Sequence, residues 1–142
     1  MIASIIITSY NYGKFLGRSI RSCLNQSINE PYEVIVVDDN SKDESIKVAS
    51  EFKHFKNFKI LRNKKNLGVA ETSNRGFKIA KGKFIVRIDA DDYVSKNFLL
   101  FLTYYMKENS ISMIIDKKNL FMGESKKDIT KDILDLVNKK IK

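Results

Sequence analysis

The sequence has few of the residues on which covalent crosslinks and zinc sites depend. Its 142 residues include a single cysteine, Cys23, and a single histidine, His54. An internal disulfide is therefore excluded, and so is a zinc site built from four cysteine or histidine ligands. His54 lies in a charged stretch, which argues against a Ser-His-Asp or Cys-His hydrolase. Any metal ion must therefore bind to carboxylates.

Long apolar runs are also absent. The amino terminus has no basic leader, and its apolar run is too short for a signal peptide. The longest later run, residues 98–106, falls well short of the roughly 20 residues that a membrane span needs. We therefore expect a cytoplasmic protein, with peripheral attachment to the inner face of the membrane as the alternative.

Positive charge exceeds negative charge. The formal net charge is +9, which favours an anionic partner. Much of the excess lies in the Lys-rich residues 117–142, and no basic block is interleaved with aromatic residues. Nucleic acid is thus a weak expectation, and a module that binds nucleic acid or a membrane surface rests on the charge alone.

Short apolar runs alternate with helical patterns along the chain. The runs are typical of buried parallel strands and lie at residues 5–8, 33–38, 58–61 and 84–88, with a fifth expected at 111–115. Helical patterns fill the intervals, at about 15–24, 41–52, 69–80 and 96–108. This order predicts an α/β fold, with a mainly parallel, Rossmann-like sheet flanked by helices over residues 1–115. Residues 116–142 are predicted to form a tail with a Lys-rich loop and an amphipathic helix.

Three local patterns predict how these helices begin and pack. Ser41 and Glu44 fit a capping box that would open the second helix. Phe77 is expected to face inward from the third helix, and Cys23 is expected in the core as an unreactive residue.

Acidic residues follow two of the predicted strands at the ends where ligands bind in such sheets. Asp89 and Asp91 follow the fourth strand, and like charges packed together favour a divalent cation such as Mg²⁺ or Mn²⁺. The alternative is an ordinary turn. Asp38 and Asp39 end the second strand, where they could accept hydrogen bonds from ribose hydroxyls or a base edge, or assist the cap of the next helix.

Two further loops carry polar or flexible residues. Thr8 and Tyr10 end the first strand, and the Tyr10 ring could stack on a base. Residues 66–74 include Gly68 at the predicted start of a helix, where exposed N–H groups suit an anion. Neither a Gly-x-Gly-x-x-Gly nor a Gly-Lys-Ser/Thr motif is present, so neither dinucleotide binding of the Rossmann kind nor a P-loop is supported.

Four segments at these strand ends and loops read, in order, Ile-Ile-Thr-Ser-Tyr-Asn, Val-Ile-Val-Val-Asp-Asp-Asn-Ser-Lys-Asp-Glu-Ser, Asn-Leu-Gly-Val-Ala-Glu-Thr-Ser-Asn and Ala-Lys-Gly-Lys-Phe-Ile-Val-Arg-Ile-Asp-Ala-Asp-Asp. Together they resemble the nucleotide-sugar half of family 2 glycosyltransferases of the GT-A fold. The resemblance covers about residues 2–110. It implies a nucleotide-diphosphate sugar as donor and Mn²⁺ or Mg²⁺ as cofactor.

The resemblance also implies roles for individual residues. Thr8 and Tyr10 would contact the nucleoside, and Asp39 would bind the base edge with Asp38 beside it. Asp89 and Asp91 resemble the Asp-x-Asp motif, in which Asp91 binds the metal ion and Asp89 lies near the ribose or a water. The remaining expected contacts, packed around the nucleotide, are Asn66, Gly68 and Asn74.

Such enzymes also have a second half that binds the acceptor and supplies a general base. Only residues 116–142 follow the predicted sheet, so the resemblance implies that the acceptor half is truncated, and no base is identified. The acceptor, which could be a glycan, a lipid or a protein, is unknown. The expected function is glycosyl transfer to an acceptor hydroxyl, and the alternative is a truncated, non-catalytic sugar-nucleotide-binding or scaffolding subunit. The tail helix would either pair with a second copy of the chain or fold onto its own domain.

Overall fold

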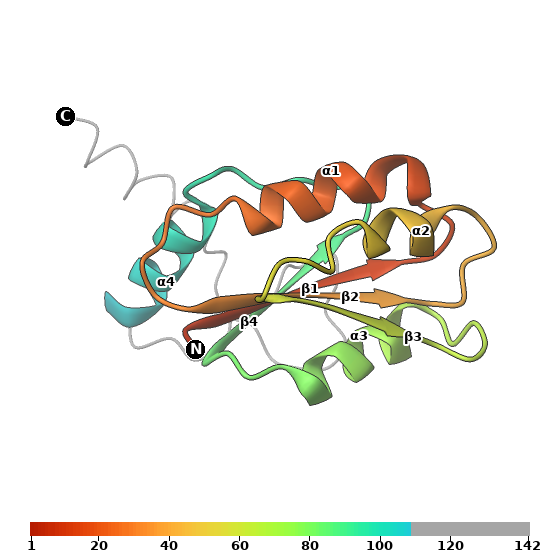
Figure 1. The fold of residues 1–142 in the computed structure, drawn as a ribbon. Helices are drawn as coiled ribbons and strands as arrows, with labels where there is room; N and C mark the ends of the chain where they lie inside the picture. Colours follow the sequence, from red (N-terminus) through yellow and green to blue (C-terminus); the bar gives the residue numbers. More distant parts are fainter. Residues whose placement is uncertain (109–142) are drawn as a thin grey trace.

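A four-stranded parallel sheet forms the centre of the computed structural model, which describes residues 1–108 (Figure 1). The strands are β1 (Ala3–Ser9), β2 (Tyr32–Asp38), β3 (Phe58–Arg62) and β4 (Phe84–Asp89), in the order β3-β2-β1-β4. All three pairings are parallel, as the alternation of strands and helices predicts. The expected strand at 111–115, the domain boundary at residue 115 and the tail helix lie outside the described residues.

Helices cover both faces of this sheet. On one face lie α1 (Gly13–Leu24) and α2 (Ser45–Ser50), and on the other lies α3 (Val69–Ile79) (Figure 1). Helix α4 (Phe98–Glu108) lies at the end of the sheet, and its Leu99 packs in the same core cluster as α1. Within residues 1–108, no helix combines the length and the apolar character that a membrane crossing requires. The predicted α/β architecture with helices on both faces is confirmed.

Strand β1 is buried along its whole length because it has a neighbouring strand on each side and helices above and below. Its alternate side chains divide the core: Ile5 and Ile7 pack in the cluster beneath α1, and Ile6 packs on the α3 side. Cys23 on α1 belongs to the larger cluster, as predicted. Burial raises the pKa of its thiol to about 12, so it stays protonated and unreactive.

Helix α3 lies close to the sheet because the residues that face the sheet are small. Thr72, Ser73 and Gly76 are buried, whereas Phe77 is 39% exposed. A Cβ atom on Gly76 would lie 2.5 Å from Cγ2 of Ile6, so a bulky side chain at this position would push the helix away. The prediction that Phe77 faces inward is therefore wrong.

The predicted capping box is also wrong. Helix α2 begins at Ser45, and its first N–H group is met by Asp43 Oδ1, 3.0 Å from Ser45 N. The Ser41 hydroxyl instead accepts a hydrogen bond from the backbone N–H of Asn11 at 2.9 Å. This tertiary bond joins the loop after β1 to the loop after β2.

A buried carboxylate joins the strands near their amino ends. Glu33, on β2, accepts hydrogen bonds from Ser4 Oγ at 2.8 Å, from Lys59 Nζ at 2.8 Å and from the backbone N–H of Lys81 at 2.7 Å. Burial alone would raise the pKa of Glu33, but these hydrogen bonds outweigh it and lower the pKa below its ordinary value of 4.5. The carboxylate thus ties β1, β3 and the turn before β4 to β2.

We expect Gly76→Ala to destabilise the fold. The new methyl group would overlap Ile6, and overpacking of this kind costs about 1–3 kcal/mol, more than the roughly 1 kcal/mol that alanine gains over glycine in a helix. Urea unfolding measures the difference. Lys78→Ala, at an exposed position of the same helix, is the control and should stay within about 0.5 kcal/mol of the parent. Equal stability of Gly76→Ala and the parent would contradict the close packing of α3.

We expect Glu33→Gln to lower the free energy of unfolding at neutral pH by about 1–3 kcal/mol, because an amide cannot satisfy three donors as a carboxylate does. Since the folded-state pKa of Glu33 is lowered, its contribution is present above the ordinary value of 4.5 and is lost as the pH falls through the folded-state pKa. The gap between parent and variant should therefore close in acid. Urea unfolding at about pH 7 and about pH 3 tests this, with the exposed Glu51→Gln as control. A gap that stays constant with pH would contradict it.

Candidate functional site

The carboxyl ends of β1, β2 and β4 meet the start of α3 around a cleft of about 390 Å³. The residues that line it are Thr8, Ser9, Tyr10, Tyr12, Asp39, Asn66, Gly68, Val69, Thr72, Asp89, Ala90 and Asp91. All but two of the predicted site residues are in this set. The exceptions are Asp38 and Asn74.

Asp38 is fully buried and stabilises the loop that follows β2. Its Oδ2 accepts a hydrogen bond from Ser41 N at 3.1 Å and lies 3.3 Å from Nε of Arg62. Arg62 also donates to the Ser41 carbonyl at 3.0 Å. Asn74 is exposed on α3 and does not line the cleft. Neither Asp38 nor Asn74 therefore reaches the cleft.

Asp39 is held by donors from the loop that leads to α3. Its Oδ1 accepts hydrogen bonds from Asn63 Nδ2 at 2.7 Å and from Leu67 N at 2.8 Å, and its Oδ2 accepts from Gly68 N at 2.9 Å. Burial would raise the pKa of Asp39, but hydrogen bonds from these groups and from Thr72 lower it below its ordinary value. Asp39 is thus a charged carboxylate, with neutral donors on one side and the cleft on the other.

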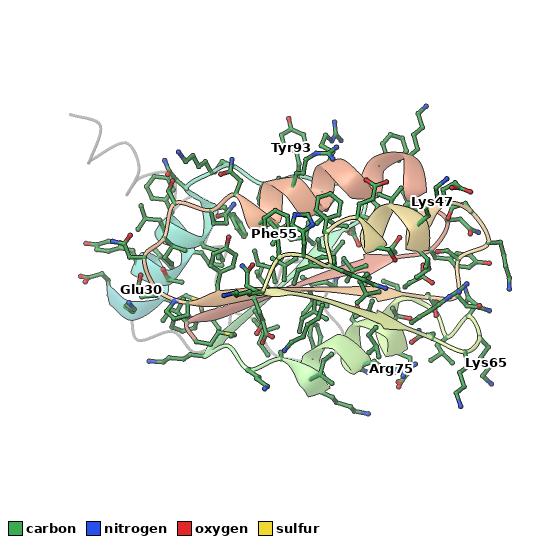
Figure 2. The ribbon with its side chains drawn as sticks, in the orientation of Figure 1. Glu30, Lys47, Phe55, Lys65, Arg75 and Tyr93 are labelled. Atoms are coloured by element: carbon green, nitrogen blue, oxygen red, sulfur yellow. The ribbon has the colours of Figure 1, made fainter. Side chains whose placement is uncertain are left out.

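Asn63 continues this network into α3. It is 2% exposed, and its Nδ2 donates to Thr72 Oγ1 at 2.9 Å as well as to Asp39. Its Oδ1 accepts a hydrogen bond from Arg75. Arg75 lies on α3, which follows the loop that carries Lys65 (Figure 2). Every polar atom of the Asn63 side chain therefore has a partner, and β3, β2 and α3 are joined at one point.

Asp89 forms an ion pair within its own strand. Arg87 lies two residues earlier on β4, so both side chains project from the same face. Its Nη1 contacts Asp89 Oδ1, its Nη2 lies 3.3 Å from Oδ2, and Nη1 also donates to Thr8 Oγ1 at 3.1 Å. The Arg87 side chain is 13% exposed and that of Asp89 is 43% exposed. Asp89 therefore faces the cleft with its charge already balanced.

Helix α1 positions the loop that carries Asp91. Arg18 donates to the Asp91 carbonyl at 3.1 Å, and its guanidinium lies 4.7 Å from the ring centroid of Tyr93, an exposed residue beside α1 (Figure 2). One turn further along α1, the Ser22 hydroxyl accepts a hydrogen bond from Val94 N at 3.1 Å. The Asp91 carboxylate is exposed and has no hydrogen-bond or ion-pair partner within residues 1–108.

Two tyrosines form the wall of the cleft on the side of β1. Tyr10 and Tyr12 are 44% and 41% exposed, so their rings are open to a ligand. Asn11 between them has a positive φ of 59°, a conformation that asparagine tolerates better than most residues. Its Oδ1 accepts a hydrogen bond from Lys42 N at 2.7 Å, which fixes this turn against the loop after β2.

The acidic residues of the cleft fit a cation that takes most of its ligands from outside the protein. Within residues 1–108, no three histidine, cysteine, aspartate or glutamate side chains are grouped to hold a metal ion. Asp91 is one free hard-oxygen ligand, and Mg²⁺ is commonly bound by one or two carboxylates together with phosphate oxygens and water. The residues present therefore suit an ion that accompanies a diphosphate rather than one enclosed by protein.

Sequence analysis missed four residues that support the site: Arg18, Arg62, Asn63 and Arg87. Arg87 could have been found, because its spacing of two from Asp89 in a predicted strand places both on one face. The others had no local signal, because the site groups that they contact, the Asp91 carbonyl, the Ser41 carbonyl and the Asp39 carboxylate, lie 73, 21 and 24 residues away in the chain.

Comparison with known proteins relates the chain to glycosyltransferases. The sequence profile described as Glycosyl transferase family 2 matches residues 4–138. The chain is 38% identical over 118 residues to the poly(ribitol-phosphate) beta-N-acetylglucosaminyltransferase TarP of Staphylococcus aureus, covering 80% of this chain and 36% of TarP. It is 32% identical over 149 residues to a poly(ribitol-phosphate) beta-glucosyltransferase of Bacillus spizizenii, covering 99% of this chain and 23% of that protein. The chain thus spans about a third or less of the length of these relatives.

A solved structure extends this likeness to three dimensions. The crystal structure of residues 1–349 of S. aureus TarS in complex with UDP is 28% identical and superposes with a TM-score of 0.72, covering 78% of this chain and 33% of that chain. The same part of TarS has also been solved in complex with UDP-GlcNAc.

We expect Asp39→Asn to loosen the loop before α3. The amide would turn an N–H group toward donors that now face a carboxylate, so at least one hydrogen bond to Leu67 or Gly68 is lost, at a cost of about 1–3 kcal/mol. Hydrogen exchange should therefore accelerate at residues 63–68 more than elsewhere. Asp92→Asn, at an exposed position, is the matched control. Unchanged exchange in this loop would contradict the bracing role of Asp39.

Proposed function

The chain belongs to glycosyl transferase family 2, and from that membership we propose that its cleft binds a nucleoside-diphosphate sugar with a divalent cation for glycosyl transfer to an acceptor hydroxyl. One observation carries this proposal: three parallel strand ends bring an open aromatic ring, a hydrogen-bonded carboxylate and a carboxylate without a partner among residues 1–108 to one cleft of about 390 Å³. That volume lies within the range usual for small-molecule sites.

The nucleoside would lie between β1 and β2. Tyr10 offers an open ring face for a base, and Asp39 Oδ2 keeps a lone pair for an N–H group on the base edge. The donors behind Asp39 fix this oxygen before the ligand arrives, which reduces the ordering cost of binding. Thr8, Asn66 and Gly68 line the same part of the proposed site.

The diphosphate and the cation would lie toward the end of β4. Asp91 is the proposed metal ligand, and Asp89 is proposed to face the ribose. When bound, Mn²⁺ or Mg²⁺ supplies Lewis-acid stabilisation of the negative charge that develops on the departing nucleoside diphosphate. The positive end of the α3 dipole meets the cleft at Gly68 and Val69 and also favours an anion there.

We propose a uridine nucleotide as the donor, because TarS binds UDP and UDP-GlcNAc and this chain is 28–29% identical to it with TM-scores of 0.71–0.72. The second candidate is a sugar-nucleotide-binding subunit without transferase activity, because the cleft carboxylates of residues 1–108, those of Asp39, Asp89 and Asp91, are all assigned to binding the donor. Measuring the release of nucleoside diphosphate from UDP-sugars, with and without glycan, lipid or protein acceptors, distinguishes the glycosyltransferase from the binding subunit. Binding without release under every condition would favour the subunit.

We expect Asp91→Asn to abolish Mn²⁺-dependent binding of UDP and to leave the fold intact, because only a metal ligand is removed from an exposed position. Titration calorimetry with UDP measures the affinity, first with Mn²⁺ and then with a chelator. Binding to the parent should fall when the chelator is added, and binding to the variant should not depend on it.

The neighbouring exposed residue provides the matched control. Asp92→Asn removes the same charge one position away from a side chain that does not line the cleft, so it should bind UDP as the parent does. Equal affinity of Asp91→Asn and the parent in Mn²⁺ would overturn the metal assignment.

A further inference from the structure

The two acidic residues at the cation end of the cleft are in different electrostatic states. Both carboxylate oxygens of Asp89 contact the guanidinium of Arg87, with Nη2 to Oδ2 at 3.3 Å. The Asp91 side chain has no such partner among residues 1–108. An arriving cation therefore meets one free carboxylate and one that is already paired.

Strand register explains why the pair forms. Residues two apart on β4 share a face, and Thr8 of β1 lies directly beside Asp89 in the parallel register. Arg87 donates to Thr8 Oγ1 at 3.1 Å in addition to both oxygens of Asp89. The Arg87 side chain is 13% exposed, so its charge is largely removed from water. Releasing Asp89 would leave this largely buried cation without its counter-charge.

We propose that Arg87 is a positioning residue that withholds Asp89 from the cation, so that the metal ion binds through Asp91 and only together with the diphosphate of the nucleotide. This inference rests on the function proposed above. An ion held by a single protein carboxylate needs other oxygen ligands, and a diphosphate supplies them. Arg87 thereby makes cation binding depend on the presence of the donor.

The same ion pair affects the nucleotide itself. Of residues 1–108, three carboxylates line the cleft, those of Asp39, Asp89 and Asp91, and a diphosphate is also an anion. Arg87 balances one of the three, which reduces the repulsion that the nucleotide meets before a cation is present. Loss of Arg87 therefore has opposite effects: the free protein gains affinity for the cation and loses affinity for the metal-free nucleotide.

The test is a titration of the full chain with Mn²⁺, followed by the electron paramagnetic resonance signal of the free ion, in the absence and presence of UDP. Arg87→Met should bind Mn²⁺ without UDP roughly tenfold more tightly than the parent, since Asp89 becomes a second charged oxygen ligand. Arg87→Lys keeps the charge and should remain near the parent. Adding Asp89→Asn to Arg87→Met should remove the gain, which a merely structural role of Arg87 would not predict. In chelator, Arg87→Met should bind UDP more weakly than the parent.

The outcomes separate this inference from the proposed function. If the parent binds UDP with Mn²⁺ but a folded Arg87→Met has the nucleotide-free Mn²⁺ affinity of the parent, the inference is overturned and the function stands. If the parent shows no Mn²⁺-dependent binding of UDP, the proposed function fails and the inference with it. Should Arg87→Met not fold, Asp89→Asn and Asp91→Asn decide, with UDP present: loss of Mn²⁺ binding in Asp91→Asn alone supports the inference, and equal loss in both variants overturns it.

Discussion

The central position of β1 is the constraint on which the rest of the structure depends. Because β2 and β4 both pair with β1 in parallel, the three strands end at the same edge of the sheet. Residues 8, 38 and 89 reach that edge from distant parts of the chain. The all-apolar Ile5-Ile-Ile7 run makes this arrangement stable, because it can be buried on both faces only if the strand is flanked on both sides and covered above and below.

The loops after β1 and β2 are held together by hydrogen bonds in both directions. Backbone N–H groups of each loop donate to side-chain oxygens of the other. Asn11 N donates to Ser41, Lys42 N donates to Asn11, and Gly13 N donates to Asp43 at 2.8 Å. A Cβ atom on Gly13 would lie 2.9 Å from Ser45 N, so glycine permits the close approach. The tyrosines of the cleft thus stand on a loop fixed by reciprocal hydrogen bonds.

The strands and most of the cleft could be predicted from the sequence because both depend on local patterns. A β-branched run followed by polar residues indicates a strand and its carboxyl end, and parallel topology then brings those ends together. The capping box predicted at Ser41 does not form, because the Ser41 hydroxyl accepts a hydrogen bond from the backbone N–H of Asn11, which is distant in the sequence. The role of Asn63 could not be predicted, because an asparagine after a strand is typical of an ordinary turn. Its contact with Asp39 arises only because β3 pairs with β2. Phe77 was misassigned because its helix buries small residues, which carry little hydrophobic signal.

The acidic residues at the ends of β2 and β4 have different partners, and this difference assigns them different chemistry. Asp38 is paired with Arg62 and sealed in the core, where it stabilises the loop after β2. Asp39 keeps its charge but is held by neutral donors, which leaves an oriented acceptor for N–H groups. Asp89 is balanced by Arg87, and Asp91 has no counter-charge within residues 1–108. Negative potential that a cation can use is therefore concentrated at Asp91, at the other end of the cleft from the acceptor at Asp39. A ligand that carries N–H donors at one end and a metal-bound diphosphate at the other matches this order of charges, whereas a simple anion or a free cation matches only part of it.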